Sequence, residues 1–208
     1  MATRQMVLLL HGLWMGPWAM NWLAGDLSES GFETRALALH STSDSPESHV
    51  ASVAQAVSDS DADRIHLLGH SLGGVIALRF LEQAKDKRLG RVLLLGAPVL
   101  GCQAALQLEQ QPWGGMLGSS RELWLGPFAR SVPGDFEVGA IAGDHAFGLG
   151  PLFTTLDGPS DGVVTVAETR IAGLRDHLVL HVSHSLMLLS SEVASQAAAF
   201  LKSGAFLR

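Results

Sequence analysis

Residues 65–83 read IHLLGHSLGGVIALRFLEQ, and this stretch decides the prediction of the fold. It begins with an apolar run of strand length at 65–68 and ends with an apolar helical pattern at 75–83. Between them stands Gly69-His70-Ser71-Leu72-Gly73-Gly74, which contains the pattern G-x-S-x-G. A sharp strand-to-helix turn lifts a serine hydroxyl above the sheet edge, and glycine on either side avoids clashes across the turn. The stretch therefore predicts a strand–turn–helix unit with Ser71 as a nucleophile.

A second match to the same pattern occurs later in the chain, at Gly158-Pro159-Ser160-Asp161-Gly162. Ser160 follows a proline and precedes the extended run 163–166, so it has no helix to open. A helix N-terminus also favours negative charge that develops at a nucleophile, and Ser160 lacks that help. We therefore assign the nucleophile to Ser71.

Apolar runs of strand length alternate with helical patterns along the whole chain. The predicted strands are 6–10, 34–39, 64–68, 91–96, 138–142 and 178–182. The predicted helices are 17–30, one that begins at Ser45-Pro46, 75–83 and 185–202. This alternation predicts an α/β fold with a doubly wound, mostly parallel sheet of about six strands.

The segment 100–134 interrupts the alternation. It holds Trp113, Trp124 and a short amphipathic stretch at 104–111. We expect it to form a small cap inserted into a single domain that spans residues 1–208, and a plain long crossover is the alternative interpretation.

Composition excludes several classes of protein. The 208 residues are 47% hydrophobic, so disorder is not expected, and the net charge of −6 argues against a nucleic-acid partner. A single cysteine, Cys102, rules out an internal disulfide and is expected to be buried and structural. No stretch approaches the ~20 apolar residues of a membrane span. We expect a cytoplasmic protein without stable membrane insertion.

The loop after the first predicted strand reads His11-Gly12-Leu13-Trp14. An oxyanion hole needs two backbone N–H donors aimed at one point. In this type of site one donor is the residue after the nucleophile, here Leu72, and the other comes from an earlier loop, here Leu13. Gly12 would allow close approach, and His11 is expected to be buried and to hold the loop by hydrogen bonds.

A serine hydroxyl needs a base beside it, and the late histidines are the candidates. His184 follows the predicted strand 178–182, so it would lie in a loop at the carboxyl edge of the sheet, where catalytic groups gather. His181 lies within that strand and His177 at its far end. A zinc site is not expected, because His181 and His184, three apart on a strand, point to opposite faces.

The acid that orients the base is less narrowly defined. Three aspartates, Asp144, Asp157 and Asp161, lie between Ser71 and His184 in the chain, which is the order that this architecture requires. Each could instead be a turn or cap residue.

These motifs resemble those of lipases and esterases in the α/β-hydrolase superfamily. The run 69–74 resembles their nucleophile elbow, and His11-Gly12 resembles their oxyanion loop. Ser160-Asp161-Gly162-Val163-Val164 is similar to the segment that carries their acid, and Val182-Ser183-His184 is similar to the loop that carries their histidine. The resemblance runs from about residue 6 to residue 201 and favours Asp161 over Asp144 as the acid.

The resemblance implies a serine esterase that acts on a small-molecule ester or acyl substrate through Ser71, His184 and Asp161. An acyltransferase, a thioesterase or an amidase could use the same residues, and a non-catalytic binding module or a lyase could use the same fold. No phosphate-binding glycine loop is present, so no cofactor is expected, and no metal either. The short chain and the missing secretion signal depart from secreted lipases and argue against insoluble triglycerides.

The substrate pocket is the least determined part. Trp14, Trp18 and Trp22 recur every four residues, which predicts one helical face packed in the core, although Trp14 also remains a candidate for the pocket. Further pocket candidates from the expected cap are Trp113, Met116 and Leu117. The resemblance favours short or medium acyl esters.

Overall fold

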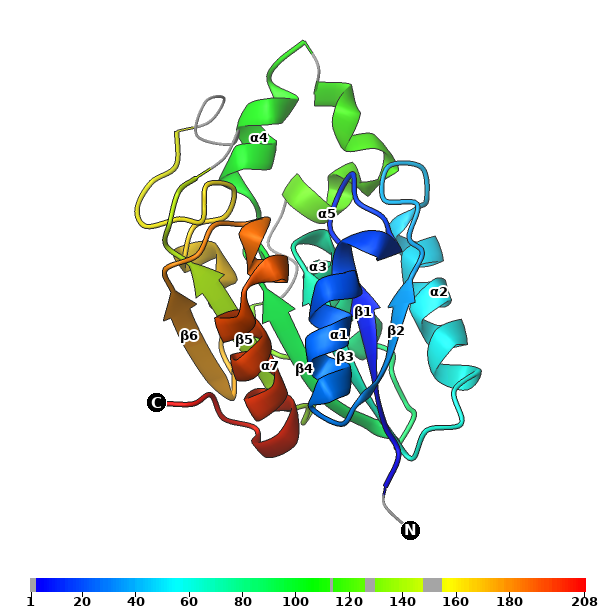
Figure 1. The fold of residues 1–208 in the computed structure, drawn as a ribbon. Helices are drawn as coiled ribbons and strands as arrows, with labels where there is room; N and C mark the ends of the chain where they lie inside the picture. The colour runs from blue at the N-terminus through cyan, green and yellow to red at the C-terminus, as the bar shows by residue number, and fades with distance from the viewer. Residues whose placement is uncertain (1–2, 113, 126–129, 148–154) are drawn as a thin grey trace.

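The computed structural model describes residues 3–112, 114–125, 130–147 and 155–208. Six strands form one sheet in the order β2-β1-β3-β4-β5-β6, and every neighbouring pair is parallel (Figure 1). The strands are β1 (Gln5–Leu10), β2 (Glu33–Leu37), β3 (Arg64–His70), β4 (Leu89–Leu95), β5 (Val138–Gly143) and β6 (Asp176–Leu180). The predicted doubly wound sheet is therefore confirmed, and it is parallel throughout.

The central strands are continuous apolar runs because both faces of the sheet are covered. In β1, Val7, Leu8, Leu9 and Leu10 are all fully buried. Alternate side chains enter different cores, so Leu8 and Leu10 pack on one face and Val7 and Leu9 on the other. Each such side chain contributes about 1.5–3 kcal/mol through burial.

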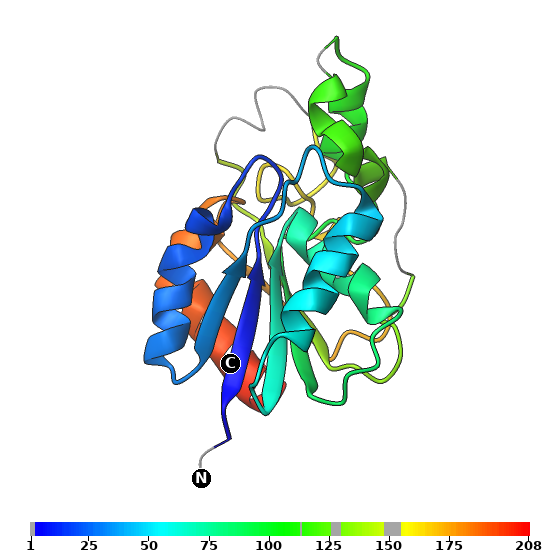
Figure 2. The ribbon, with the colours of Figure 1, turned by 90° about the vertical axis from the view of Figure 1, so that its right-hand side faces the viewer.

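Two pairs of helices cover the two faces, as Figure 2 shows. Helices α1 (Asn21–Glu29) and α7 (Ser191–Ser203) pack together on one face, and α2 (Pro46–Ser58) and α3 (Leu72–Leu81) pack on the other. The helix predicted at 185–202 is divided into the 3-10 turn η4 (Leu186–Leu189) and α7, because Ser190 is extended and caps α7 through its side chain.

Helix α3 begins at Leu72, three residues before the predicted start at 75. From the sequence, Gly73 and Gly74 suggest a loop, but they lie in the first turn of α3. Glycine is needed at both positions because a larger side chain would clash with neighbouring segments. A Cβ atom on Gly73 would lie 2.1 Å from the Leu10 carbonyl oxygen, and one on Gly74 would lie 2.5 Å from the Ala97 Cβ.

The described residues of the segment 100–134 contain three short helices, α4 (Gln103–Glu109), η2 (Gly114–Arg121) and α5 (Glu122–Leu125). They lie beyond the carboxyl edge of the sheet, at the top of Figure 1. The Ser119 N–H donates to the Thr42 carbonyl at 2.8 Å, and Trp14 Nε1–H donates to the Met116 carbonyl at 3.0 Å. These bonds attach the segment to the loops that follow β1 and β2.

The prediction that Trp14, Trp18 and Trp22 pack in the core is wrong. Their exposed fractions are 55%, 70% and 60%. The 3-10 turn η1 (Pro17–Met20) and α1 instead bury Met20, Leu23 and Leu27, so Trp18 and Trp22 remain exposed.

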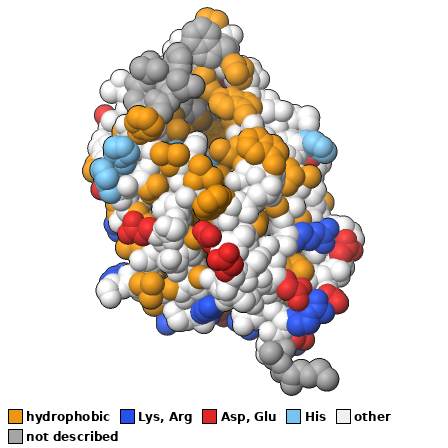
Figure 3. All heavy atoms as spheres, viewed as in Figure 1, with side chains coloured by type: hydrophobic (Ala, Val, Ile, Leu, Met, Phe, Trp, Pro, Cys, Tyr) orange, Lys and Arg blue, Asp and Glu red, His pale blue; other side chains and the backbone are white. Residues whose placement is uncertain are grey.

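Figure 3 shows hydrophobic side chains gathered on the upper part of the face that carries α1 and α7, around a hollow. None of the helices in the described part of the chain is long and apolar enough to cross a membrane.

Candidate active site

Ser71 stands between β3 and α3 in an unusual backbone conformation, with φ 54° and ψ −121°. A non-glycine residue with positive φ costs about 1–3 kcal/mol and persists only where its surroundings enforce it. Here the Ser71 N–H donates to the Leu95 carbonyl at 2.8 Å. A Cβ atom on Gly69 would lie 2.4 Å from the Gly73 carbonyl, so the chain can fold back tightly only with glycine there. The strand–turn–helix unit thus has the geometry of a nucleophile elbow.

The loop after β1 lies directly against Ser71. A Cβ atom on Gly12 would be 3.1 Å from the Ser71 Cβ. Residues 12–15 form a turn in which the Met15 N–H faces the Gly12 carbonyl at 3.4 Å and Trp14 has φ 57°.

The two predicted donors, the N–H groups of Leu13 and Leu72, belong to the residues that directly follow Gly12 and Ser71. The Trp14 N–H is taken by Ser41 Oγ at 3.1 Å, so it is not a free donor. Leu13 precedes it in the same turn, and Leu72 is the first residue of α3, where an N–H has no acceptor within its own helix.

His11 is fully buried and holds this loop, as expected from the sequence. The Leu39 N–H donates to its Nε2 at 3.1 Å, so Nδ1 carries the proton and donates to the Gly12 carbonyl at 2.9 Å. Burial lowers the pKa of His11, in keeping with a neutral ring that takes part in the loop rather than in proton transfer.

Asp161 and His184 form a buried pair. The side chain of Asp161 is 1% exposed and that of His184 is 9% exposed, and His184 Nδ1–H donates to Asp161 Oδ2 at 2.7 Å. The His184 N–H also donates to the Asp161 carbonyl at 3.0 Å. The other carboxylate oxygen, Oδ1, accepts the N–H groups of Val163 and Val164 at 3.0 and 2.8 Å. The aspartate is therefore fixed on both oxygens, and the imidazole presents its Nε2 on the far side of the ring from Asp161.

His70 connects this pair to the elbow. Its Nε2–H donates to the His184 carbonyl at 3.0 Å, and the centroids of the two rings are 4.7 Å apart. Burial, followed by the charge of His184, lowers the pKa of His70 to about 3, so its ring is neutral near neutral pH.

In the part of the chain that the structure describes, the His184 side chain bonds to Asp161 and the Ser71 hydroxyl makes no hydrogen bond. The hydrogen bond between a catalytic serine and its histidine is often long before substrate binds, and it tightens in the complex with substrate. The connection through His70 places both residues at the same edge of the sheet.

The other two aspartates have different partners. Asp144 pairs with His181 Nδ1 at 2.9 Å on the surface, where the His181 side chain is 76% exposed. The Asp157 N–H donates to the Gln103 side chain at 3.2 Å. Among the three aspartates, Asp161 is therefore the one that contacts His184.

The pocket candidates are spread over different environments. Trp14 and Met116 are about half exposed and joined by a hydrogen bond, whereas Leu117 is buried in the core on the α2 and α3 face. Trp113 lies outside the described residues.

Cys102 is buried, and its Sγ contacts the Val163 carbonyl at 3.8 Å. Burial raises its pKa to about 12, which makes it a poor nucleophile. Within the described ranges, no group of three or more His, Cys, Asp or Glu residues is arranged to hold a metal ion.

The sequence analysis did not assign a role to three residues of this site, Gly96, Gly143 and His70. A Cβ atom on Gly96 would lie 2.9 Å from Asp161 Oδ2, and one on Gly143 would lie 2.8 Å from the Asp161 Cβ. Gly96 is the last residue of a predicted strand and Gly143 directly follows another, so their positions at strand ends were the available signal. His70 gave no signal beyond its place in the elbow.

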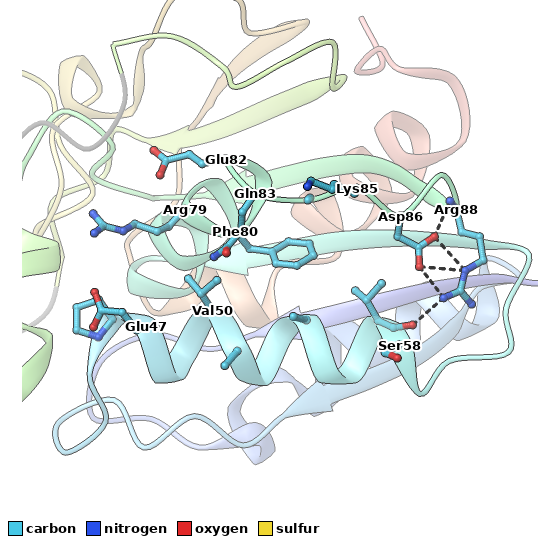
Figure 4. A pocket seen from close by; sticks show the side chains of 15 residues that line it. Glu47, Val50, Ser58, Arg79, Phe80, Glu82, Gln83, Lys85, Asp86 and Arg88 are labelled. Atoms are coloured by element: carbon cyan, nitrogen blue, oxygen red, sulfur yellow. Dashed lines mark hydrogen bonds and ion pairs between the residues drawn. The ribbon is translucent and has the colours of Figure 1, made fainter.

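A separate groove of about 740 Å³ lies between α2 and the end of α3, with Val50 and Phe80 on its walls and the Asp86–Arg88 ion pair at one end (Figure 4). None of the predicted site residues lines it.

Residues 7–201 match the alpha/beta hydrolase family. No curated protein matches the chain in sequence. Among solved structures, the chain is similar to the propeptide form of the Bacillus licheniformis lipase BlEst2, with a TM-score of 0.79 and 18% identity over 99% of this chain and 51% of that one. The chain thus spans about half the length of that form, and it covers 94% of the mature form with a TM-score of 0.72.

The chain is also similar to the metagenomic carboxyl esterase MGS0156, with a TM-score of 0.69 and 18% identity over 88% of this chain and 65% of that one. A further similar structure is the Bottromycin epimerase BotH, with a TM-score of 0.59 and 20% identity over 97% and 92%. At such identities these likenesses show a shared fold.

Proposed function

The chain belongs to the alpha/beta hydrolase family, and on that premise we propose that it is a serine hydrolase that cleaves carboxylic esters of small molecules. Ser71 is the nucleophile, His184 the general base and Asp161 the acid that orients it. The backbone N–H groups of Leu13 and Leu72 form the oxyanion hole. The observation that carries the proposal is the buried 2.7 Å hydrogen bond from His184 to Asp161, at the sheet edge that carries the Ser71 elbow.

The steps of the proposed reaction follow from the proton donors and acceptors of the site. Asp161 accepts the Nδ1–H of His184, which leaves the lone pair of Nε2 to take the Ser71 proton as Oγ attacks the ester carbonyl carbon. The carbonyl oxygen becomes an oxyanion that faces the two N–H donors. Collapse breaks the ester bond, and the leaving alcohol takes the proton from Nε2. Water then attacks the acyl-enzyme by the same route and releases the acid and free Ser71.

The surroundings favour an uncharged, apolar substrate. Trp14 belongs to the predicted oxyanion loop and bonds to the Met116 carbonyl, and Leu186, two residues after His184, is 45% exposed. These side chains offer apolar surface to an acyl or alcohol group, in line with short or medium acyl esters.

A series of p-nitrophenyl esters of graded chain length tests the proposal, together with the variants Ser71→Ala and Ser160→Ala. We expect Ser71→Ala to lose at least about 10³-fold in kcat/KM, as in other triads. Ser160→Ala is the matched control, since it removes the same hydroxyl from the second match, and it should lose far less activity than Ser71→Ala.

A fluorophosphonate probe should label the wild type and Ser160→Ala but not Ser71→Ala. Ester hydrolysis by Ser71→Ala near the wild-type rate would refute the assignment. Added methanol separates hydrolysis from acyl transfer, because an acyltransferase would yield the methyl ester in place of the free acid.

A further inference from the structure

Glu168 is a buried carboxylate that no step of the proposed reaction uses. It lies in the 3-10 turn η3 (Ala167–Thr169), between β5 and β6, and is 7% exposed. Its Oε1 accepts the Gln103 N–H at 2.6 Å, and its Oε2 accepts the N–H and the hydroxyl of Thr165 at 2.6 and 2.9 Å. One carboxylate thus joins the start of α4 to the segment that follows Asp161.

The orientation of Asp161 depends on that segment. Asp161 Oδ1 is held by the N–H groups of Val163 and Val164, and the Asp161 N–H donates to the Val164 carbonyl at 3.1 Å. Thr165 is the next residue, and its own N–H and hydroxyl are both fixed by Glu168. The peptide groups that aim the Asp161 carboxylate at His184 are therefore anchored immediately downstream by Glu168.

A second set of contacts ties the same two segments together. Cys102 Sγ contacts the Val163 carbonyl, and the Gln103 side chain accepts the Asp157 N–H. The Leu100 N–H donates to the Glu168 carbonyl at 3.1 Å. The beginning of the 100–134 segment and the loop that carries Asp161 are thus joined at several points around Glu168.

We infer that Glu168 is a positioning residue, which sets the geometry of the Asp161–His184 pair by clamping the loop 161–165 against the start of α4. This inference rests on the proposed function, in which that pair activates Ser71. Misplacing the pair by a fraction of an ångström should reduce turnover while leaving substrate binding nearly intact.

The position requires two acceptor oxygens. The variant Glu168→Gln has nearly the same size but only one oxygen, so its NH2 group must face either the Gln103 N–H or the Thr165 donors. A buried N–H without an acceptor is destabilising, and the loop relieves this by shifting.

The test uses Glu168→Gln and Thr165→Val, which removes only one hydroxyl from the clamp. Glu82→Gln, on an exposed residue at the end of α3, is the control. The first readout is the downfield NMR resonance of the His184 Nδ1–H proton in the resting protein, with Asp161→Asn as the reference that abolishes it. The second is kcat and KM on a p-nitrophenyl ester, measured well below the melting temperature.

We expect Glu168→Gln to shift or broaden the resonance and to lower kcat by about 10- to 100-fold with KM within about twofold. Thr165→Val should change both readouts in the same direction by a smaller amount. An unchanged resonance and kcat in a destabilised but folded Glu168→Gln would overturn the inference. If Glu168→Gln does not fold, an unchanged resonance in Thr165→Val would overturn it. The NMR readout needs no turnover, so it separates a failure of this inference from a failure of the proposed esterase activity.

Discussion

The chain contains the pattern G-x-S-x-G twice, at 69–73 and at 158–162, and the two copies form different structures. At the first, Ser71 takes φ 54° between a buried strand and a helix. At the second, Ser160 pairs with Thr165 in an isolated antiparallel bridge, within a tight loop whose tip carries Asp161. The flanking residues, rather than the pattern, decide which structure forms.

The glycines of the two copies also serve different purposes. Gly69 and Gly73 are required by crowding, since a Cβ atom on either would lie within 2.4 Å of backbone atoms. Gly158 meets nothing within 4 Å and is required only by its φ of +97°. The first copy is therefore crowded at its glycines, whereas Gly158 of the second copy has free space around it. In the proposed site, the first supplies the nucleophile and the second supplies the acid.

The largest expected effect on kcat comes from replacing Asp161, the acid that the second copy supplies. Asp161→Asn should lower kcat by about 10³- to 10⁴-fold, because an amide that faces Nδ1 stabilises the wrong tautomer of His184. Asp144→Asn, which alters the exposed pair with His181, should stay within about twofold. Both are measured as kcat on a p-nitrophenyl ester. A large loss in Asp144→Asn with little loss in Asp161→Asn would reverse the assignment.

A stability measurement separates the crowded copy from the open one. Gly73→Ala should destabilise by about 3 kcal/mol or more, because its Cβ must push against the Leu10 carbonyl. Gly158→Ala should cost about 1 kcal/mol, the penalty of positive φ alone. Urea unfolding of both variants gives the two free energies. Equal losses would show that crowding does not define the elbow.

Much of this arrangement could be predicted because local signals agreed with the global fold. The buried strands are continuous apolar runs, and their order of alternation with helices leaves few parallel topologies. Ser71 and His184 could be placed because each follows a predicted strand at its carboxyl end. Asp161 could not be chosen from spacing alone, since Asp144 and Asp157 satisfied the same order.

The remaining features depend on contacts between distant segments. Trp18 and Trp22 have helical spacing, but Met20, Leu23 and Leu27 occupy the side of the helix that faces the sheet. Thr165 and Glu168 have the spacing of a capping box, and each side chain bonds to the N–H of the other residue. The bond from the Gln103 N–H to Glu168 joins distant segments through a backbone donor, so the sequence gives no sign of it. A residue that binds main-chain donors places no constraint on the side chains opposite it.

The remaining expected effect concerns the pH dependence of stability, and it uses a histidine that the first copy has and the second lacks. Burial lowers the pKa of His70 from 6.5 to about 3. Between these values the unfolded chain binds a proton that the folded protein does not, so the contribution of His70 is fully present above pH 6.5 and is lost as the pH falls toward 3. Its slope is at most about 1.4 kcal/mol per pH unit.

His70→Gln cannot take up this proton, and its amide can still donate to the His184 carbonyl. Urea unfolding at a series of pH values should therefore show a flatter acid limb for His70→Gln over the whole interval. His66→Gln, at the opposite end of β3, is the comparison. Burial and the charges of Arg64 and Arg91 lower the pKa of His66 to about 4, so its removal should flatten the limb only above that pH. An unchanged slope in His70→Gln would mean that His70 can be protonated in the folded protein without a loss of stability.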